Sequence, residues 1–174
     1  MPSRRDAVDV ITDQWKRERP ELDPLPMGVI GRISRIATLL QRELDRVFAD
    51  YGLSGADFDV LATLRRAGDP YRLTPGELTR STMVTTGGMT KRLDRLETAG
   101  LIRREPDPRD RRGKLIALTD RGRLLVDRAM EAHLENERRL LAALPARKRD
   151  ELAALLRELL VTLEPAAGGD ADSG

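Results

Sequence analysis

The chain has 174 residues, a formal net charge of +2 and no cysteine. The absence of cysteine excludes disulfides, thiolate chemistry and thiol-based redox sensing. No apolar run approaches the ~20 residues of a membrane-spanning helix. The N-terminus also lacks the apolar core of a signal peptide. We therefore expect a soluble cytoplasmic protein with no membrane segment.

The first 26 residues predict an added helix and a linker. Val8, Ile11 and Trp15 recur at helical spacing within residues 6–19, which is typical of a short amphipathic helix. Pro20, Pro24 and Pro26 then predict a stiff linker. Residues 27–52 predict a long helix ended by Gly52, with an apolar stripe of Ile33, Ile36, Leu40, Leu44, Val47 and Tyr51.

Residues 53–119 predict a compact domain of short capped helices followed by a hairpin. Ser54, with Asp57 three residues later, predicts the start of a helix whose core face holds Phe58, Leu61 and Leu64. Thr74, Pro75 and Glu77 predict a second start, since they supply an N-cap, a proline in the first turn and a capping-box acid.

A turn at residues 81–85 separates that helix from the next one. We expect Thr85 or Thr86 to cap this later helix, which runs to about Ala99 and stops at Gly100. A strand over residues 101–105, a turn-rich segment over 106–113 and a return strand over 114–118 complete the domain. A helix-turn-helix followed by a basic β-hairpin, or wing, is a DNA-reading layout.

The charge distribution supports the same conclusion. Residues 72–123 carry 13 Lys and Arg against 7 Asp and Glu, a net charge of +6, whereas the remaining residues sum to −4. A nearly neutral protein has thus concentrated its positive charge where a polyanion would bind.

Two leucine-rich helices are predicted after the wing. Thr119 caps a helix over residues 120–143, and Pro145 begins another that carries a leucine stripe. These helices exceed what a small winged domain needs for its own core. We therefore read residues 120–164, together with the first long helix, as a dimer interface, with a monomeric helical bundle as the alternative. Residues 165–174 have the composition of a disordered tail.

The predicted DNA contacts lie on the second helix of the helix-turn-helix and on the wing. In the helix, Met89, Leu93 and Leu96 recur at core spacing, which leaves the opposite side free for base and phosphate contacts. Arginines on a narrow hairpin can enter the minor groove, and Asp107 and Asp110 are expected to brace them. The predicted contact residues are Thr86, Gly87, Gly88, Thr90, Lys91, Arg95, Arg109, Arg111 and Arg112. Alternatively, Lys91 and Arg95 only form a solvated helix face.

The chain resembles the MarR family of transcriptional regulators over nearly its whole ordered length. The resemblance rests on residues 54–64, on Leu73-Thr74-Pro75-Gly76-Glu77-Leu78, on residues 93–102, and on the wing sequence Asp107-Pro108-Arg109-Asp110-Arg111-Arg112-Gly113 followed by Leu118-Thr119 and Gly122. It implies a mainly α-helical fold with a small β-wing, a winged helix-turn-helix homodimer. Such dimers bind pseudo-palindromic operators on double-stranded DNA, usually repress a nearby gene, and release DNA when a small molecule binds.

The added N-terminal helix is similar to that of the urate-responsive subgroup, which includes PecS-like regulators and others that answer to trans-aconitate or citrate. This resemblance implies an effector site formed by Trp15, Asp59, Arg92 and Arg104, with Thr90 at a position where some members have Ser. Two arginines would bind an anion. We hypothesise that Asp59 pairs with Arg92 in the free protein and that the anion competes for this arginine. Taken singly, each residue has an ordinary structural explanation.

Other functions fit the sequence less well. The only histidine, His133, lies among glutamates on a long helix, but the remaining ligands of a metal site are missing, so we expect it to be solvated or at an interface. We find no motif for catalysis or for a cofactor. A constitutive or architectural DNA-binding protein would have no use for Trp15 and its helix, and a single histidine makes a pH sensor a weak alternative.

Overall fold

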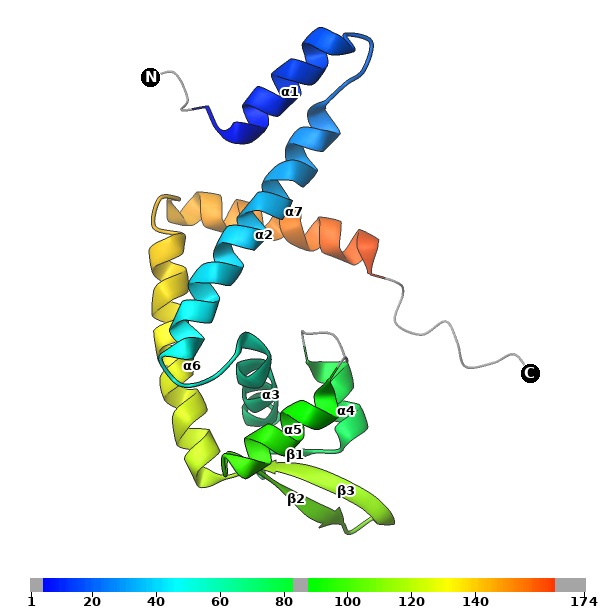
Figure 1. Cartoon of the computed structure of the whole chain (residues 1–174), viewed down its shortest axis with the longest axis vertical. Helices are drawn as coiled ribbons and strands as arrows, with labels where there is room; N and C mark the ends of the chain where they lie inside the picture. Colours follow the sequence, from blue (N-terminus) through cyan, green and yellow to red (C-terminus); the bar gives the residue numbers. More distant parts are fainter. Residues whose placement is uncertain (1–4, 83–87, 165–174) are drawn as a thin grey trace, which may run out of the picture. The chain divides into compact units, whose positions relative to one another are not determined.

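The computed structural model describes residues 5–82 and 88–164, apart from the side chain of Arg111. These residues form seven helices and three strands (Figure 1). The elements are α1 (Ala7–Glu18), α2 (Leu25–Ala49), α3 (Gly55–Arg66), β1 (Arg72–Leu73), α4 (Pro75–Ser81), α5 (Met89–Thr98), β2 (Ile102–Asp107), β3 (Asp110–Leu118), α6 (Asp120–Leu140) and α7 (Ala146–Leu163). The mainly helical fold with a small antiparallel wing confirms the predicted fold class.

The predicted capping boxes of α3 and α4 are confirmed. The Ser54 and Asp57 side chains each accept a hydrogen bond from the other's backbone N–H, at 3.1 Å in both directions. Thr74 and Glu77 make the same exchange at 2.8 and 3.2 Å. Because both boxes are local, the sequence motif alone is sufficient to place these helix starts.

Two helix starts differ from the prediction. Pro26 is not part of the linker, because α2 begins at Leu25 and a proline in the first helical turn loses no hydrogen bond. Helix α5 begins at Met89 after Gly88, whose φ of 81° is left-handed, and no side-chain hydrogen bond caps it. The expectation that Thr85 or Thr86 is the N-cap is therefore wrong; both residues lie outside the described part of the chain.

The wing is also longer than expected. The three strands lie in the order β1-β3-β2, and β2 pairs with β3 in a register that runs from Ile102 opposite Leu118 to Asp107 opposite Asp110. Residues 106–113 are thus mostly strand, with Pro108 and Arg109 at the turn. Pro106 is tolerated because the pairing becomes irregular between Pro106 and Asp107.

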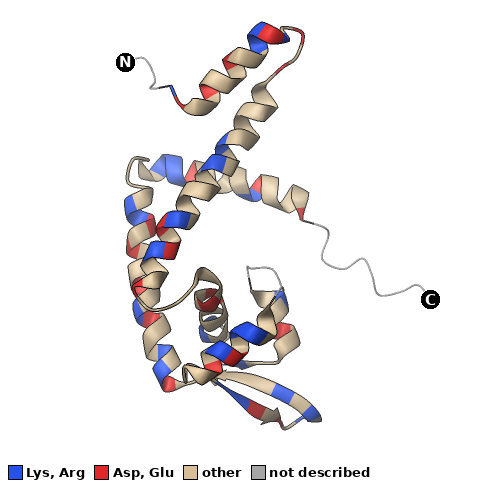
Figure 2. Ribbon diagram, in the orientation of Figure 1, with Lys and Arg blue, Asp and Glu red and all other residues tan. Residues whose placement is uncertain are grey.

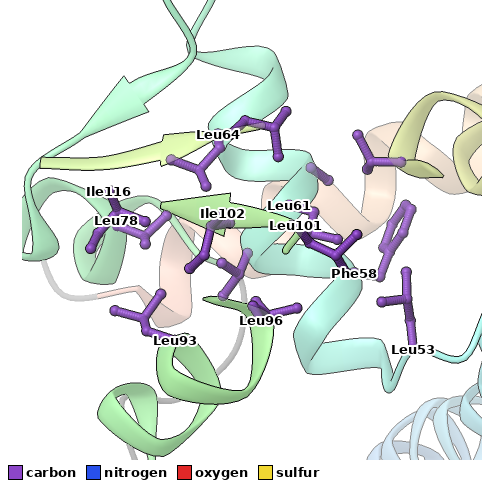
Figure 3. Close-up of a cluster of buried hydrophobic side chains, with 14 of the residues drawn as sticks. Leu53, Phe58, Leu61, Leu64, Leu78, Leu93, Leu96, Leu101, Ile102 and Ile116 are labelled. Atoms are coloured by element: carbon purple, nitrogen blue, oxygen red, sulfur yellow. The ribbon is translucent and has the colours of Figure 1, made fainter. Parts of the chain in front are cut away.

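One hydrophobic core joins the three helices of the helix-turn-helix region to the wing (Figure 3). Its fully buried side chains include Leu61 and Leu64 of α3, Leu78 of α4 and Leu96 of α5. The Phe48 ring at the end of α2 stacks on Phe58 at a centroid distance of 4.3 Å. This shared core fixes α5 against the base of the wing.

His133 packs against two aromatic rings, so the expectation that it is solvated is wrong; the alternative, that it lies at an interface, stays a prediction. Its ring lies 5.2 Å from that of Phe48 and 5.3 Å from that of Phe58, and the residue is half-buried. The sequence could not show this, because the three residues come from three different helices. Among residues 5–82 and 88–164, no cluster of His, Cys, Asp or Glu has the arrangement of a metal site.

The chain divides into two compact units within α6. The first ends at His133 and the second begins at Leu134. In the second unit, α7 has no buried residue and exposes a leucine stripe that includes Leu152, Leu155, Leu156 and Leu160. No helix in the described parts of the chain is both long enough and apolar enough to cross a bilayer.

Candidate DNA interface and effector site

Helix α5 is amphipathic, with apolar residues on its buried side and polar residues on its exposed side, as the sequence predicts. Met89, Leu93 and Leu96 are buried, whereas Thr90, Lys91 and Arg95 are exposed. Figure 2 shows Lys and Arg positions along α5 and toward the end of the wing. Helix α5 therefore presents a polar, basic surface of a kind that fits a major groove.

The turn before α5 lies only partly within the described residues. Gly88 has a left-handed backbone in which a side chain is strained. The predicted contacts Thr86 and Gly87 lie outside the described residues.

The wing turn is held by its two aspartates. The Asp107 carboxylate accepts a hydrogen bond from the Arg109 backbone N–H at 2.9 Å and lies 3.5 Å from the Arg109 guanidinium. The Asp110 carboxylate accepts from the backbone N–H of Arg112 at 2.9 Å. The predicted bracing of an arginine side chain is thus confirmed for Asp107, whereas Asp110 accepts from a backbone N–H and forms no ion pair with a described side chain. Arg109 and Arg112 point outward with exposed side chains.

Arg104 of β2 connects the wing to α5. Its guanidinium donates to Asp94 at 2.6 Å and also to Glu97, while its backbone N–H donates to Glu97 at 3.1 Å. These hydrogen bonds, chiefly the one to Asp94, raise the pKa of Arg104 above its ordinary value. The sequence suggested an arginine available for a ligand, but the structure shows one shared between two carboxylates.

A second ion pair joins the same part of α5 to helix α3. The Arg95 guanidinium lies 2.5 Å from the Asp57 carboxylate, which is 6% exposed and also takes part in the α3 capping box. Arg95 itself is 60% exposed. The pairing joins residues 38 positions apart in the sequence, so no local sequence signal indicates it.

Three polar groups are buried in or beside the core. Asp59 and Thr63 lie on α3 among fully buried neighbours, at 9% and 1% exposure. Arg92 is half-buried next to the core residue Leu93, and its Nη1 atom is buried without a hydrogen-bond partner among the described residues. A buried, unsatisfied guanidinium nitrogen is costly, and an anion would satisfy it. The Asp59–Arg92 ion pair stays a hypothesis.

Trp15 lies away from these residues within one chain. Helix α1 packs on the first part of α2, with Val8 beside Gly31, Thr12 beside Gly28, and Arg32 paired to Asp9 at 2.5 Å. The two helices are therefore antiparallel.

This packing places Trp15, which is 44% exposed, toward the start of α2. Helix α3 contacts the opposite end of α2 at Phe48. Because an α-helix rises 1.5 Å per residue, about 30 Å of α2 separates Gly28 from Phe48. The structure does not bring Trp15 to Asp59, Arg92 or Arg104 of the same chain.

A capped helix-turn-helix, an outward basic helix and an arginine-tipped wing define a winged-helix DNA-binding protein. Comparison with known proteins agrees: residues 51–113 match the model of the MarR family. The chain is 48% identical to the transcriptional regulator PecS of Dickeya dadantii over 86% of its own length and 90% of that protein. The chain belongs to the MarR family; it is a DNA-binding transcriptional regulator and not an enzyme.

Solved structures with bound DNA share the fold. The Streptomyces coelicolor regulator Sco3205 in complex with DNA superimposes with a TM-score of 0.74 at 28% identity, over 83% of this chain and 91% of that one. A mutant of Escherichia coli MarR in complex with operator DNA superimposes with a TM-score of 0.66 at 27% identity, over 84% and 97% of the respective chains.

Proposed function

We propose that this regulator is a homodimeric repressor that binds a pseudo-palindromic operator and is released by a small anionic metabolite. Urate and tricarboxylates such as trans-aconitate or citrate are the candidate effectors. A regulator of the same fold with an unrelated effector, or with none, is the alternative.

The dimer is supported by apolar surface that each unit leaves exposed. In α2, Ile30 and Leu39 are each 57% exposed, and in α7 Leu155 is 58% and Val161 68% exposed. A second copy of the chain that covered these side chains would remove their apolar surface from water. Light scattering during size-exclusion chromatography tests the dimer, and a monomeric mass at working concentration would contradict it.

The DNA contacts are proposed from the outward α5 residues and the wing arginines. Arg111→Ala should lower the affinity for every duplex and reduce the salt slope by about one unit per lost phosphate contact. An unchanged slope and affinity would exclude a phosphate contact at this position.

The effector site is supported chiefly by Arg92, whose buried Nη1 lacks a hydrogen-bond partner among the described residues. An anion there would give the guanidinium a bidentate partner. Arg104 is a weaker candidate in the free protein, because an effector must first displace Asp94 and Glu97. Displacing them would remove the ion pairs that join α5 to the wing and loosen their relative orientation, which links effector binding to DNA release.

Trp15 can join this site only if it comes from the other chain of the dimer. We therefore propose that the partner subunit's Trp15 covers the ligand, since α2 holds it away from Arg92 of its own chain. A planar indole provides a stacking surface for a purine such as urate.

The test uses Trp15 fluorescence, because the chain has no other tryptophan. Urate, trans-aconitate and citrate are titrated separately, with a correction for urate absorption, into wild type, Arg92→Ala and Asp59→Ser. Saturable quenching by one compound that both variants lose, while their DNA binding persists, supports the site. A variant that still leaves DNA at the wild-type effector concentration would refute it, and no response to any compound favours the alternative.

A further inference from the structure

The turn between α6 and α7 concentrates positive charge. Residues 138–149 contain five Lys or Arg and no Asp or Glu, whereas residues 134–164 as a whole contain six basic and six acidic residues. The second unit is therefore neutral, but its cations gather at one turn. Figure 2 shows Lys and Arg on both sides of this turn, at the end of α6 and at the start of α7. We define the turn cluster as Arg138, Arg139, Arg147, Lys148 and Arg149.

The start of α7 places three of these cations where a helix disfavours them. Arg147, Lys148 and Arg149 follow directly after the first helical residue, next to the positive end of the helix dipole. The first turn contains no acidic residue, and the N-cap Pro145 has no side-chain oxygen that could accept from the backbone N–H groups there. Unsatisfied N–H groups and three cations are thus found together, and an anion would stabilise this arrangement.

The three α7 cations are available to an anion. None of them forms an ion pair among the described residues, whereas Arg138 on the α6 side pairs with Glu135 at 3.0 Å. The Nε atom of Arg149 is buried and has no hydrogen-bond partner in the described structure. A cation without a carboxylate partner can bind a phosphate without displacing one.

The α6 side of the cluster is held in place by the turn itself. The Arg139 guanidinium donates to the side-chain oxygen of Asn136 at 2.6 Å, and Asn136 is only 7% exposed. The chain then closes through hydrogen bonds from the Ala142 N–H to the Arg139 carbonyl at 3.2 Å and from the Leu144 N–H to the Leu141 carbonyl at 3.0 Å. The two halves of the cluster therefore lie on one compact, hydrogen-bonded turn.

The form of the cluster indicates its partner. Its cations extend over two helix ends and all except the half-buried Arg149 are exposed, so they suit a long polyanion better than a small ion. Duplex DNA carries one negative charge per about 1.7 Å of its axis, and Lys, Arg and helix N-termini are common phosphate contacts. The cluster lies in the second unit, whereas α5 and the wing lie in the first. None of its residues belongs to the predicted DNA contacts.

We propose that the turn cluster binds the phosphate backbone of a second DNA segment, so that one regulator joins two duplexes. Such binding needs no base contact and is therefore independent of sequence and sensitive to salt. A weak site is sufficient, because a regulator already bound to DNA meets other segments of the same molecule at a high effective concentration.

A bead assay with the full-length protein tests this proposal. The protein is bound to a short immobilised duplex of mixed sequence, and a second, fluorescently labelled duplex is titrated onto it. Three phosphate contacts predict that wild-type affinity for the second duplex falls about 40-fold between about 50 and 200 mM salt. Arg147→Gln/Lys148→Gln/Arg149→Gln should lower that affinity about tenfold or more at the lower salt concentration and leave the affinity for the immobilised duplex unchanged.

The matched control is Lys16→Gln/Arg17→Gln/Arg19→Gln. It removes the same residue types and the same charge from exposed positions at the end of α1, where the helix dipole favours cations. This variant should bind both duplexes like wild type. The α7 variant should melt at or above the wild-type temperature, because it removes cations from the positive end of a helix dipole.

Several results would overturn the proposal. Wild type that binds the immobilised duplex without capturing the second one would do so. So would capture by the α7 variant at wild-type affinity, which is the result expected if the two duplexes are joined through the winged domains of a dimer. An equal loss in the α1 control, an equal loss of affinity for the immobilised duplex, or a lower melting temperature of the α7 variant would also contradict it.

Discussion

Arg104 gives the sharpest test of how the wing holds helix α5. Arg104→Gln removes the guanidinium that bridges Asp94 and Glu97. Hydrogen bonds to charged groups contribute about 1.5–3 kcal/mol when buried, and exposed ion pairs about 0–1 kcal/mol. The side chains of Arg104, Asp94 and Glu97 are 30%, 58% and 37% exposed, so their interaction lies between the buried and the exposed case. We expect a loss of about 1–2 kcal/mol in the free energy of unfolding.

A double-mutant cycle isolates the interaction from other effects of the substitution. Arg104→Gln, Asp94→Asn and the double variant are compared by urea unfolding at one fixed protein concentration, because dimerisation makes stability concentration-dependent. The expected coupling energy is about 0.5–1 kcal/mol. The matched control is Arg103→Gln, since this neighbour is 56% exposed and its partner among the described residues is Glu105 on the same strand.

The same variants connect stability to DNA binding. If Arg104 holds α5 and the wing in one orientation, operator affinity measured by fluorescence anisotropy should fall about three- to tenfold in Arg104→Gln without effector. Arg103 is also basic, so its replacement should change only the salt-dependent part of binding. A coupling energy within about 0.3 kcal/mol of zero, or an equal stability loss in Arg103→Gln, would refute the reasoning.

Three further substitutions test the scaffold. Gly122→Ala should unfold the α6–wing junction, because a Cβ there would stand 2.0 Å from the Leu101 carbonyl oxygen. Circular dichroism should show a much lower melting temperature. A melting temperature equal to that of wild type would contradict the close contact between Gly122 and Leu101. Leu61→Ala removes a fully buried side chain and should cost about 2–5 kcal/mol in urea unfolding. Glu77 has a pKa lowered below 4.5, chiefly by the hydrogen bond from the Thr74 backbone N–H. Its contribution is therefore fully present well above the ordinary glutamate pKa and is lost as pH falls through the folded pKa. The stability difference between wild type and Glu77→Gln should shrink in acid, and a constant difference would exclude this linkage.

Much of the DNA-reading unit could be predicted from the sequence, since its signals are local. The capping boxes at Ser54 and Thr74 lie within four consecutive residues, and the core face of α5 follows from a period of 3.6. The longer wing could not be predicted, because Pro106 and the charged residues around it are typical of a turn. Pairing with β3 overrides that local preference.

The candidate effector site depends even more than the wing on contacts that the sequence does not show. The sequence selected Trp15, Asp59, Arg92 and Arg104 only through their family resemblance, and it could not show that α2 separates the tryptophan from the rest. The sequence also gave no indication that Arg104 forms ion pairs with Asp94 and Glu97, because an ion pair between a strand and a helix depends on how the chain folds back on itself.

The sequence by itself determined the class of this protein: the helix starts, the amphipathic α5, the basic wing and the family. These properties are encoded by residues near one another in the chain, where spacing fixes geometry. Only the tertiary structure decided which charges are free and which are paired. Arg95 and Arg104 are held by carboxylates, whereas Arg147 and Lys148 make no ion pair in the described parts of the chain. The reason is that electrostatic pairing and burial depend on distances between elements far apart in sequence.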